Sequence, residues 1–404
     1  MSRILFISGS IGLGHAGRDL AIARALRARS PGVEITWLAG EPARSVLRDA
    51  GEAMHPRGDR YASDSDPADA AATLGGLNLF RYLMRARGQW AANARLVGEL
   101  VRDERFDAVV ADEAYEVVVA LVRHQIAMPM PLVMIYDFLG LDATTASPFE
   151  RLGVEFWNRV WAQDRKIFTG GKDVALFVGE PEDVPDRPLG LGLPSRRAHA
   201  VAHYRFVGYV LPFDLEEVAD RARVRAELGY GAGPLVLASV GGTAAGGDLL
   251  QACGRAFPLL TPRYPALRMK LVCGPRIPRA SIAVPMGVEV VGYVPALYRH
   301  LAACDMAVVQ GGGTTTLELT ALRRPFVYVP LEGQCEQELV AGRVARHGAG
   351  IRLSRRDLTP ERLAELIVAS VGKEATWPAI RADGANVAAG AIAEAIARRA
   401  ATAA

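Results

Sequence analysis

The stretch VVQGGGTTTLELTALRRPFVYVP, residues 308–330, joins two apolar runs through three glycines, three threonines and a glutamate. The flanking runs are typical of buried parallel strands, and the segment between them has helical spacing. Glycine removes a Cβ atom where a backbone must approach a ligand closely. Threonine hydroxyls and free N–H groups at a helix start can cap the helix or donate to phosphate oxygens. The stretch therefore predicts a strand, a ligand-binding turn, a helix and a further strand.

The same alternation runs through the whole chain. Short apolar runs stand at residues 3–8, 33–38, 107–111, 132–136 and 174–178, and again at 234–240, 269–273, 288–291, 306–309 and 326–329. We predict an α/β protein with two Rossmann-like, doubly wound parallel sheets. The predicted divisions are a first domain at 1–208, a connector at 209–233, a second domain at 234–385, and a helix with a tail at 386–404. Ligands bind such sheets at the carboxyl ends of the strands, so we expect the site in a cleft between the domains.

Composition excludes several classes of protein. Half of the 404 residues are hydrophobic and 23% are charged, which excludes a disordered chain. Lys and Arg (47) nearly balance Asp and Glu (44), which argues against a nucleic-acid binder. The four cysteines are far apart in sequence and lack metal-ligand spacing, which predicts reduced thiols in a cytoplasmic protein and no bound metal. No uncharged apolar segment reaches the roughly 18 residues needed to span a bilayer. Residues 77–90 mix aromatic side chains with arginines and read as a packed amphipathic helix or, alternatively, as a contact with an anionic membrane.

The loop after the first predicted strand carries the first candidate for chemistry. In SGSIGLGHAGRD, residues 8–19, the glycines follow G-x-x-G-x-G rather than the dinucleotide spacing G-x-G-x-x-G. An imidazole titrates near neutrality, so His15 could take a proton from a hydroxyl, although a capping or loop histidine is the alternative. Asp112 ends the run at 107–111 and could orient His15 or cap a helix. We expect Glu113, the next residue, to be structural.

The second half carries a set of residues that fits a nucleotide. A turn after the run at 234–240 could hold an anion through its backbone N–H groups; it contains Gly241, Gly242 and Thr243. Glu318 follows one helical turn into the segment after the three glycines, where a carboxylate could accept hydrogen bonds from a ribose diol. Glu336 and Gln337 lie in a loop after Pro330 and could meet sugar hydroxyls.

These residues carry a resemblance to the GT-B glycosyltransferases of families 1 and 28, which use nucleotide-activated sugars. The family 1 signature H-x-G-x-x-[ST]-x-x-E is matched by Gln310, Gly312, Thr315 and Glu318. Glutamine replaces the usual phosphate-binding histidine at 310. The acidic residue and glutamine that bind the donor sugar match Glu336 and Gln337, whereas the asparagine often found three residues later is Val340.

The resemblance implies a fold and a division of roles. In this family the first domain binds the acceptor, the second binds the nucleotide sugar, and a cleft separates them. It implies that His15 is the base, oriented by Asp112, and that Tyr293 and Val294 meet the nucleobase. The implied cradle for the donor comprises Gly241, Gly242, Thr243, Gln310, Gly312, Gly313, Thr314, Thr315, Glu318, Glu336 and Gln337.

The resemblance also implies an activity. The expected reaction moves a hexose-type sugar, with inversion and without metal or another cofactor, from a UDP or TDP donor to a hydroxyl. The expected acceptor is a small molecule, a natural product or a lipid. Two alternatives remain at this point: a nucleotide-sugar epimerase on the same fold, and a non-catalytic subunit that binds nucleotide sugars.

Overall fold

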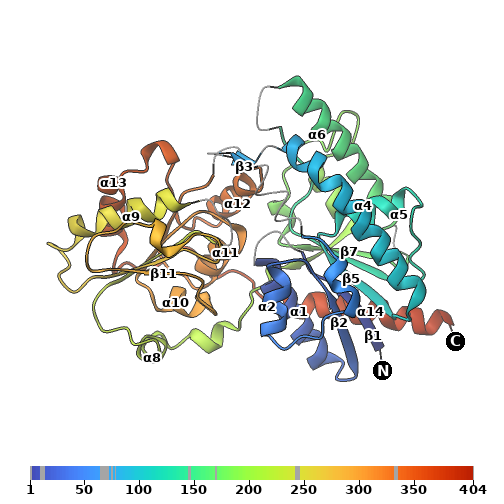
Figure 1. The fold of residues 1–404 in the computed structure, drawn as a ribbon, viewed down its shortest axis with the longest axis horizontal. Helices are drawn as coiled ribbons and strands as arrows, with labels where there is room; N and C mark the ends of the chain where they lie inside the picture. Colours follow the sequence, from blue (N-terminus) through green and yellow to red (C-terminus); the bar gives the residue numbers. More distant parts are fainter. Residues whose placement is uncertain are drawn as a thin grey trace. The chain divides into compact units, whose positions relative to one another are not determined.

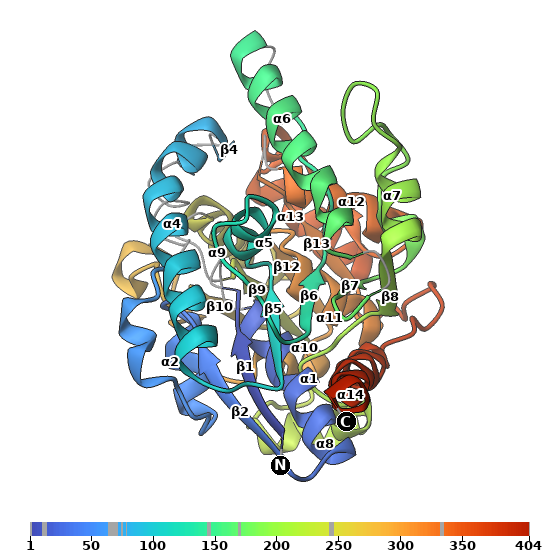
Figure 2. The ribbon, with the colours of Figure 1, turned by 90° about the vertical axis from the view of Figure 1, so that its right-hand side faces the viewer.

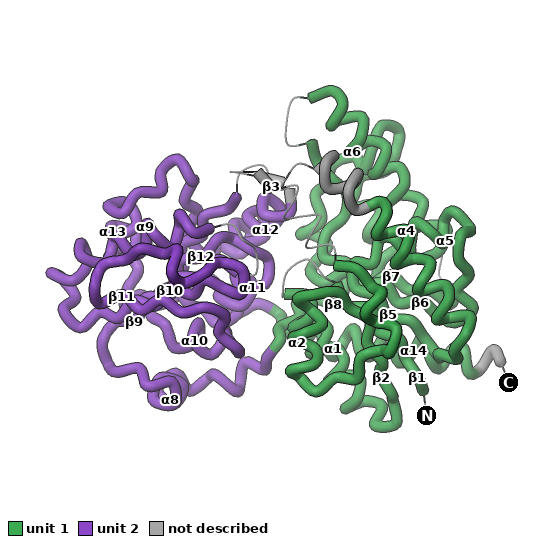
Figure 3. Tube along the Cα trace, viewed as in Figure 1, with its two compact units in different colours: residues 1–212, 381–404 green, residues 213–380 purple. Residues whose placement is uncertain are grey.

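The computed structural model describes residues 2–9, 14–63, 72–73, 76–77, 79–143, 147–168, 171–241, 246–331 and 335–403. The chain folds into two compact units, which Figure 3 shows in different colours. Unit 1 comprises residues 1–212 and 381–404, and unit 2 comprises residues 213–380. The last segment of the chain therefore returns to the unit in which the chain begins.

Unit 1 is built on a parallel sheet in the order β2-β1-β5-β6-β7-β8. Its strands are β1 (Ser2–Ile7), β2 (Val33–Leu38), β5 (Ala108–Asp112), β6 (Leu132–Tyr136), β7 (Val174–Val178) and β8 (Tyr204–Gly208). Its α-helices are α1 (Gly14–Arg29), α2 (Ala43–Asp49), α4 (Leu79–Asp103), α5 (Tyr115–Val122), α6 (Pro148–Trp161), α7 (Arg196–His203) and α14 (Gly384–Ala403). Shorter elements are η1 (Pro56–Arg60), η2 (Ala162–Lys166), η3 (Pro181–Asp183) and the antiparallel pair β3 (Ala72–Thr73) and β4 (Gly76–Leu77).

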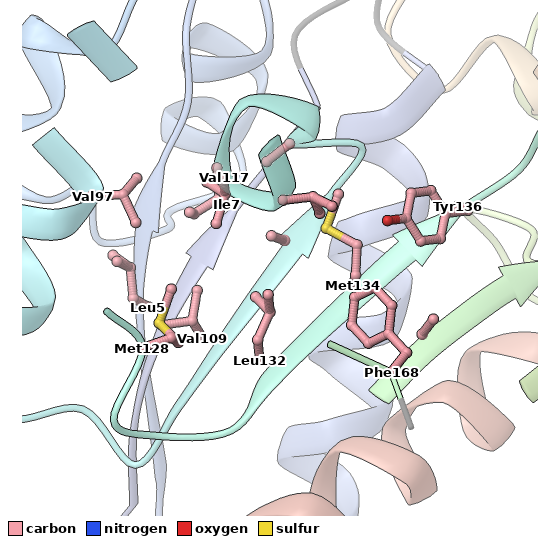
Figure 4. Close-up of a cluster of buried hydrophobic side chains, with 14 of the residues drawn as sticks. Leu5, Ile7, Val97, Val109, Val117, Met128, Leu132, Met134, Tyr136 and Phe168 are labelled. Carbon is pink, nitrogen blue, oxygen red and sulfur yellow. The ribbon is translucent and has the colours of Figure 1, made fainter. Parts of the chain in front are cut away.

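Two apolar layers cover the faces of this sheet because side chains alternate along each strand. Leu5 and Ile7 of β1 point into a core shared with α4 and α5, part of which Figure 4 shows. Ile4 and Phe6 point the opposite way, into a core shared with α1 and α14. The two helices lie side by side in Figures 1 and 2. The alanines of α14 allow this close packing, so the C-terminal helix is part of the core of unit 1.

Unit 2 repeats the arrangement in the order β11-β10-β9-β12-β13-β14, again with parallel pairing. Its strands are β9 (Leu235–Ser239), β10 (Arg268–Val272), β11 (Val288–Val291), β12 (Met306–Val309), β13 (Phe326–Tyr328) and β14 (Ile351–Arg352). Its α-helices are α8 (Arg221–Glu227), α9 (Gly247–Leu260), α10 (Leu297–Ala303), α11 (Gly313–Ala321), α12 (Cys335–Arg346) and α13 (Pro360–Ser370). Three short turns complete it: η4 (Leu215–Val218), η5 (Arg279–Ser281) and η6 (Arg355–Asp357).

The prediction of two doubly wound parallel sheets is confirmed. The sequence did not predict β8 and β14, which are the last strands of their sheets. Both are partly exposed and carry arginine, so they lack the continuous apolar run that marks a central strand. In each sheet the first strand of the half is the neighbour of a later one, β1 of β5 and β9 of β12, which brings their carboxyl ends to one edge.

Candidate functional site

In unit 1, His15 and Asp112 meet at the carboxyl edge of the sheet. The register pairs Ile7 of β1 with Ala111 of β5, so both strands end together. His15 is the second residue of α1, and Asp112 is the last residue of β5. The Nδ1 atom of His15 lies 3.0 Å from Oδ2 of Asp112. Thus two residues that are 97 positions apart form the contact that the sequence suggested.

Arg18 and Asp137 join this contact, and sequence reasoning missed both. Arg18 Nη2 donates to Oδ1 and Oδ2 of Asp112 at 2.6 and 2.9 Å, and its Nη1 donates to Asp137 at 2.7 Å. Burial alone would raise the pKa of Asp112, but the charge of Arg18, together with the charge and hydrogen bond of His15, outweighs it and keeps that pKa below its ordinary value. The pKa of Asp137 is lowered in the same way, against its burial. Both carboxylates are therefore ionised at neutral pH.

Two groups contact Nδ1 of His15: Arg18 Nη2 at 2.7 Å and Asp112 Oδ2 at 3.0 Å. In the tautomer with the proton on Nδ1, His15 donates to Asp112 and keeps the lone pair on Nε2. Burial and the charge of Arg18 lower the pKa of His15, yet the charges of Asp112 and Asp137 and the hydrogen bond to Asp112 leave it raised overall.

Glu113 stands beside the same imidazole in a left-handed backbone conformation, with φ at +50°. Its Oε2 atom lies 3.7 Å from His15 Nε2. Burial and the charge of Asp137 raise the pKa of Glu113 well above its ordinary value. The prediction that Glu113 is only structural did not anticipate this contact.

In unit 2, the stretch with three glycines lies at the carboxyl end of β12. Gly311 has φ at +94°, and a Cβ atom there would lie 3.4 Å from the backbone of Pro330. Gly312 is the N-cap of α11 and offers no side chain to the helix start. Thr316 turns its hydroxyl back to the Gly312 carbonyl at 2.9 Å. The first turn of α11 therefore presents its backbone N–H groups together with the half-buried Thr314 and Thr315.

Gln310, the residue that departs from the family signature, is buried at 4% exposure. A Cβ atom on Gly246 would lie 3.0 Å from its Oε1 atom, so its amide lies against the turn that starts α9. Gly246 has φ at +106°, a conformation that favours glycine. Gln310 thus lies between the starts of α9 and α11.

Glu318 lies on α11 at 6% exposure, and no hydrogen bond or ion pair joins its carboxyl group to the residues that the structure describes. Burial raises its pKa from 4.5 to about 8. A carboxyl group buried in this way is costly unless a partner supplies hydrogen bonds. Glu318 therefore has unused capacity for a ligand next to the start of α11.

The other predicted donor-site residues occupy different settings. Gly241 lies two residues after the end of β9, with φ at +75°, while Gly242 and Thr243 lie outside the described residues. Tyr293 and Val294 follow β11, and Tyr293 is 48% exposed.

Glu336 and Gln337, which were predicted to bind the sugar, both lie at the start of α12 and differ in burial. Glu336 is exposed on α12. Gln337 is buried, and its Oε1 accepts the N–H of Leu331 at 2.7 Å, so it shapes the loop that precedes it.

Arg343 is a further residue that sequence reasoning missed. Its Nη2 atom donates to the Gly313 carbonyl at 3.2 Å, which puts a guanidinium group beside the first turn of α11. Positive charge at a helix start favours a bound anion. Arg343 lies seven residues after Glu336, about two turns along α12, so both residues lie on one face of the helix. This spacing could have predicted Arg343 as a site residue from the sequence.

A cavity of about 490 Å³ opens between α4, α5 and α6 in unit 1. Trp90 and Trp157 line it and meet edge to face, with ring centroids 5.7 Å apart. Nearby on α6, three large apolar side chains are exposed: Phe149, Leu152 and Phe156. Trp90 also ends the stretch 77–90, whose side chains at 79–86 lie outside the described residues.

The described residues lack two kinds of feature. They contain no helix with the length and apolar character needed to cross a bilayer. They also contain no group of three or more His, Cys, Asp or Glu side chains arranged to hold a metal ion.

The sequence and the fold are similar to those of known glycosyltransferases. Residues 237–396 match the glycosyltransferase family 28 C-terminal domain. Over 371 residues, 90% of this chain and 86% of the relative, the sequence is 29% identical to a UDP-N-acetylglucosamine--N-acetylmuramyl-(pentapeptide) pyrophosphoryl-undecaprenol N-acetylglucosamine transferase from Mycobacterium sp. (strain KMS). The solved glycosyltransferase of kitacinnamycin matches the fold with a TM-score of 0.62 at 18% identity, covering 98% of this chain and 96% of that one. Together these findings support a nucleotide-sugar GT-B glycosyltransferase.

A second structure shows the same GT-B fold with a nucleotide present. Spinosyn rhamnosyltransferase SpnG, complexed with thymidine diphosphate, matches with a TM-score of 0.57 at 17% identity over 98% of this chain and 96% of that chain. The predicted family and the prediction of a glycosyltransferase enzyme are therefore confirmed. The roles of the individual site residues in this GT-B enzyme stay predictions.

Proposed function

We propose that this GT-B enzyme transfers a hexose-type sugar from a UDP- or TDP-linked donor to a hydroxyl, with inversion and without metal. The observation that carries the proposal is the contact of His15 with Asp112. With the Nδ1 proton of His15 donated to Asp112, Nε2 keeps a lone pair that can accept the proton of an acceptor hydroxyl. In the transfer, the hydroxyl oxygen bonds to the anomeric carbon, its proton moves to Nε2, and the nucleoside diphosphate leaves.

The residues of unit 2 fit the donor half of this reaction. Backbone N–H groups at the start of α11, with Thr314, Thr315 and the nearby Arg343, can stabilise the negative charge of the diphosphate as it leaves. Glu318 can accept hydrogen bonds from the ribose diol, which would supply the partners that it lacks. Tyr293 and Val294 would meet the nucleobase, and Glu336 and Gln337 the sugar.

We propose an apolar acceptor, either a natural product or a lipid. The aromatic cavity between α4, α5 and α6 and the exposed apolar side chains of α6 support this choice. The mycobacterial relative acts on an undecaprenol-linked substrate, and the two matched structures belong to natural-product enzymes. Contact of residues 77–90 with a membrane remains part of the proposal.

The test is a transfer assay with UDP- and TDP-sugars and a set of apolar alcohols. His15→Ala should slow transfer about 10²–10⁴-fold, the usual contribution of a positioned base, while the Kd for the nucleotide stays unchanged. His124→Asn is the matched control, because His124 is exposed in a turn with φ at +55° that asparagine tolerates. Inversion is checked by NMR of the anomeric configuration in the product. Full activity of His15→Ala would refute the base assignment.

A further inference from the structure

Unit 2 also contains a cavity at the edge of its sheet where the strands begin. The cavity measures about 430 Å³, and all of its lining residues belong to unit 2. Asp305 and Pro325, which line it, directly precede β12 and β13. The glycines at the start of α11 follow the other end of β12, whereas Leu322, the C-cap of α11, lines the cavity. The cavity is therefore separate from the candidate donor site, and α11 runs from one to the other.

Positive charge predominates in the lining of this cavity. The charged lining residues are Arg221, Arg323, Arg324, Lys373, Asp305 and Glu374. Asp305 is already paired, because Arg221 Nη2 donates to its Oδ1 atom and Arg225 Nη1 donates to its Oδ2 atom at 3.2 Å. Within the described lining, Glu374 is then the one further carboxylate that faces Arg323, Arg324 and Lys373.

Arg323 and Arg324 use only part of their guanidinium groups inside the protein. Arg323 Nη2 donates to the Ala375 carbonyl, and Arg324 Nε donates to the Ala302 carbonyl in the last turn of α10, both at 3.0 Å. Cations often satisfy helix-end carbonyls in this way, and these two bonds alone would be a structural role. Among the described residues, however, both Nη atoms of Arg324, Nε and Nη1 of Arg323, and Nζ of Lys373 have no hydrogen-bond partner.

The half-buried Arg324 reflects this excess of positive charge. Burial lowers its pKa, the charges of Arg221 and Arg225 lower it further, and the opposing charge of Asp305 does not offset them. An anion bound in the cavity would supply the compensating charge and would accept hydrogen bonds from the unused N–H groups.

Arg323 stands where the backbone favours glycine. It follows the C-cap of α11 with φ at +53°. The N–H of Arg324 donates to the Leu319 carbonyl at 3.1 Å, a helix ending in which glycine is the usual residue at the position of Arg323. Here the position carries a guanidinium group that lines the cavity instead.

We propose that this cavity binds a ligand with linked phosphate groups, at a site separate from the candidate donor site. Guanidinium groups bind phosphate oxygens in pairs, and two of them with an ammonium group suit a ligand with several negative charges. A volume of about 430 Å³ lies in the range of small-molecule pockets. Soluble phosphates and phosphorylated lipid headgroups share this chemistry. The inference does not depend on His15 or on the identity of the sugar donor.

The probe is inorganic pyrophosphate, titrated by calorimetry into the protein with and without saturating UDP. We expect one pyrophosphate to bind per chain in the presence of UDP, with a Kd that rises with salt. If UDP abolishes the binding of pyrophosphate, the probe occupies only the donor site and the proposal is overturned. If UDP does not bind but pyrophosphate binding depends on Arg323, the proposed donor fails and this inference stands.

Arg323→Gly is the most informative variant, because glycine suits the backbone and removes the guanidinium group. We expect its melting temperature to equal or exceed that of the native protein, while the Kd for pyrophosphate rises about tenfold or more. Arg255→Gln is the matched control, since Arg255 is exposed on α9 and lies outside the lining. Its Kd should equal the native value. Equal values of Kd in the two variants would overturn the proposal.

Lys373→Gln removes a charge without disturbing the fold, because Lys373 is exposed and has no partner in the described part of the chain. We expect the Kd for pyrophosphate to rise about two- to fivefold. An unchanged Kd in both Lys373→Gln and Arg323→Gly would mean that pyrophosphate binds elsewhere, which refutes the site. Vesicles with an anionic phospholipid, compared with neutral vesicles, distinguish the sources: competition with pyrophosphate indicates a lipid headgroup, and its absence indicates a soluble phosphate.

Discussion

The candidate sites of the two units hold their charges in opposite ways. In unit 1, Arg18 joins Asp112 and Asp137 through hydrogen bonds of 2.6–2.9 Å, and Asp112 in turn accepts from His15. In unit 2, Glu318 is buried with no such partner in the described part of the chain. Charged groups that are hydrogen-bonded to one another hold each other in fixed positions. An isolated buried carboxyl group is instead poised to gain its partners from a ligand.

Removing Arg18 should give the largest effect, because it breaks the self-satisfied network. Arg18→Met keeps much of the side-chain volume but leaves Asp112 and Asp137 buried without their cation. We expect a loss of about 3–5 kcal/mol in the free energy of unfolding, measured with urea. Arg48→Met is the control, because Arg48 is exposed and its ion pair with Asp59 is long, at 3.9 Å. That variant should lose no more than about 1 kcal/mol. Equal losses would contradict the contrast between the sites.

Removing Glu318 should affect binding rather than folding. If ribose hydroxyls donate to this carboxyl group, Glu318→Ala should weaken nucleotide binding by roughly 1.5–3 kcal/mol, as measured by calorimetry. The unfolding free energy of the ligand-free protein should not fall as it does for Arg18→Met, since no protein partner is left behind. An unchanged nucleotide affinity would refute the contact with the ribose.

The raised pKa of Glu318 predicts how the stability of the ligand-free protein depends on pH. The folded state holds the Glu318 proton up to about pH 8, whereas the unfolded chain releases it near 4.5. Below pH 4.5 the carboxyl group is protonated in both states, and its contribution to the free energy of unfolding is complete. As the pH rises from 4.5 to about 8, the free energy of unfolding falls by up to about 1.4 kcal/mol per pH unit. The free energies of unfolding of the native protein and of Glu318→Gln, plotted against pH over this range, should have different slopes. Parallel slopes would show that Glu318 ionises normally in the folded state.

The smallest effect is expected at Gln310. Gln310→His restores the residue that the family signature carries, and an imidazolium should bind a diphosphate about 1 kcal/mol more tightly than a neutral amide does. The gain in affinity should be present at pH 6 and vanish at pH 8, where the imidazole is neutral. A gain that persists at pH 8 would mean that shape rather than charge distinguishes the two side chains.

The two sites also differ in how far the sequence predicted them. The strand–glycine–helix unit around Gly312 and Glu318 is local, so one stretch contains the whole pattern. The contact of His15 with Asp112 was predictable because His15 begins the helix after one strand and Asp112 ends another strand of the same parallel sheet. Arg18 lies three residues after His15 on the same helix, but its partners are 94 and 119 positions away and follow from the strand order. No pattern in the sequence reveals that Glu113 has a left-handed backbone or that the carboxyl group of Glu318 has no partner among the described residues.

The position of α14 sets an order of events during synthesis. Ala388, Ala391 and Ile392 complete the core that also holds α1, the helix that carries His15 and Arg18. These residues leave the ribosome only after all of unit 2 has been made, since unit 2 ends at residue 380. Unit 2 can therefore finish folding on a nascent chain, whereas unit 1, with the proposed base, waits for the final helix. A chain that stops before α14 would present an uncovered apolar face on α1 and would be a target for chaperones and proteases.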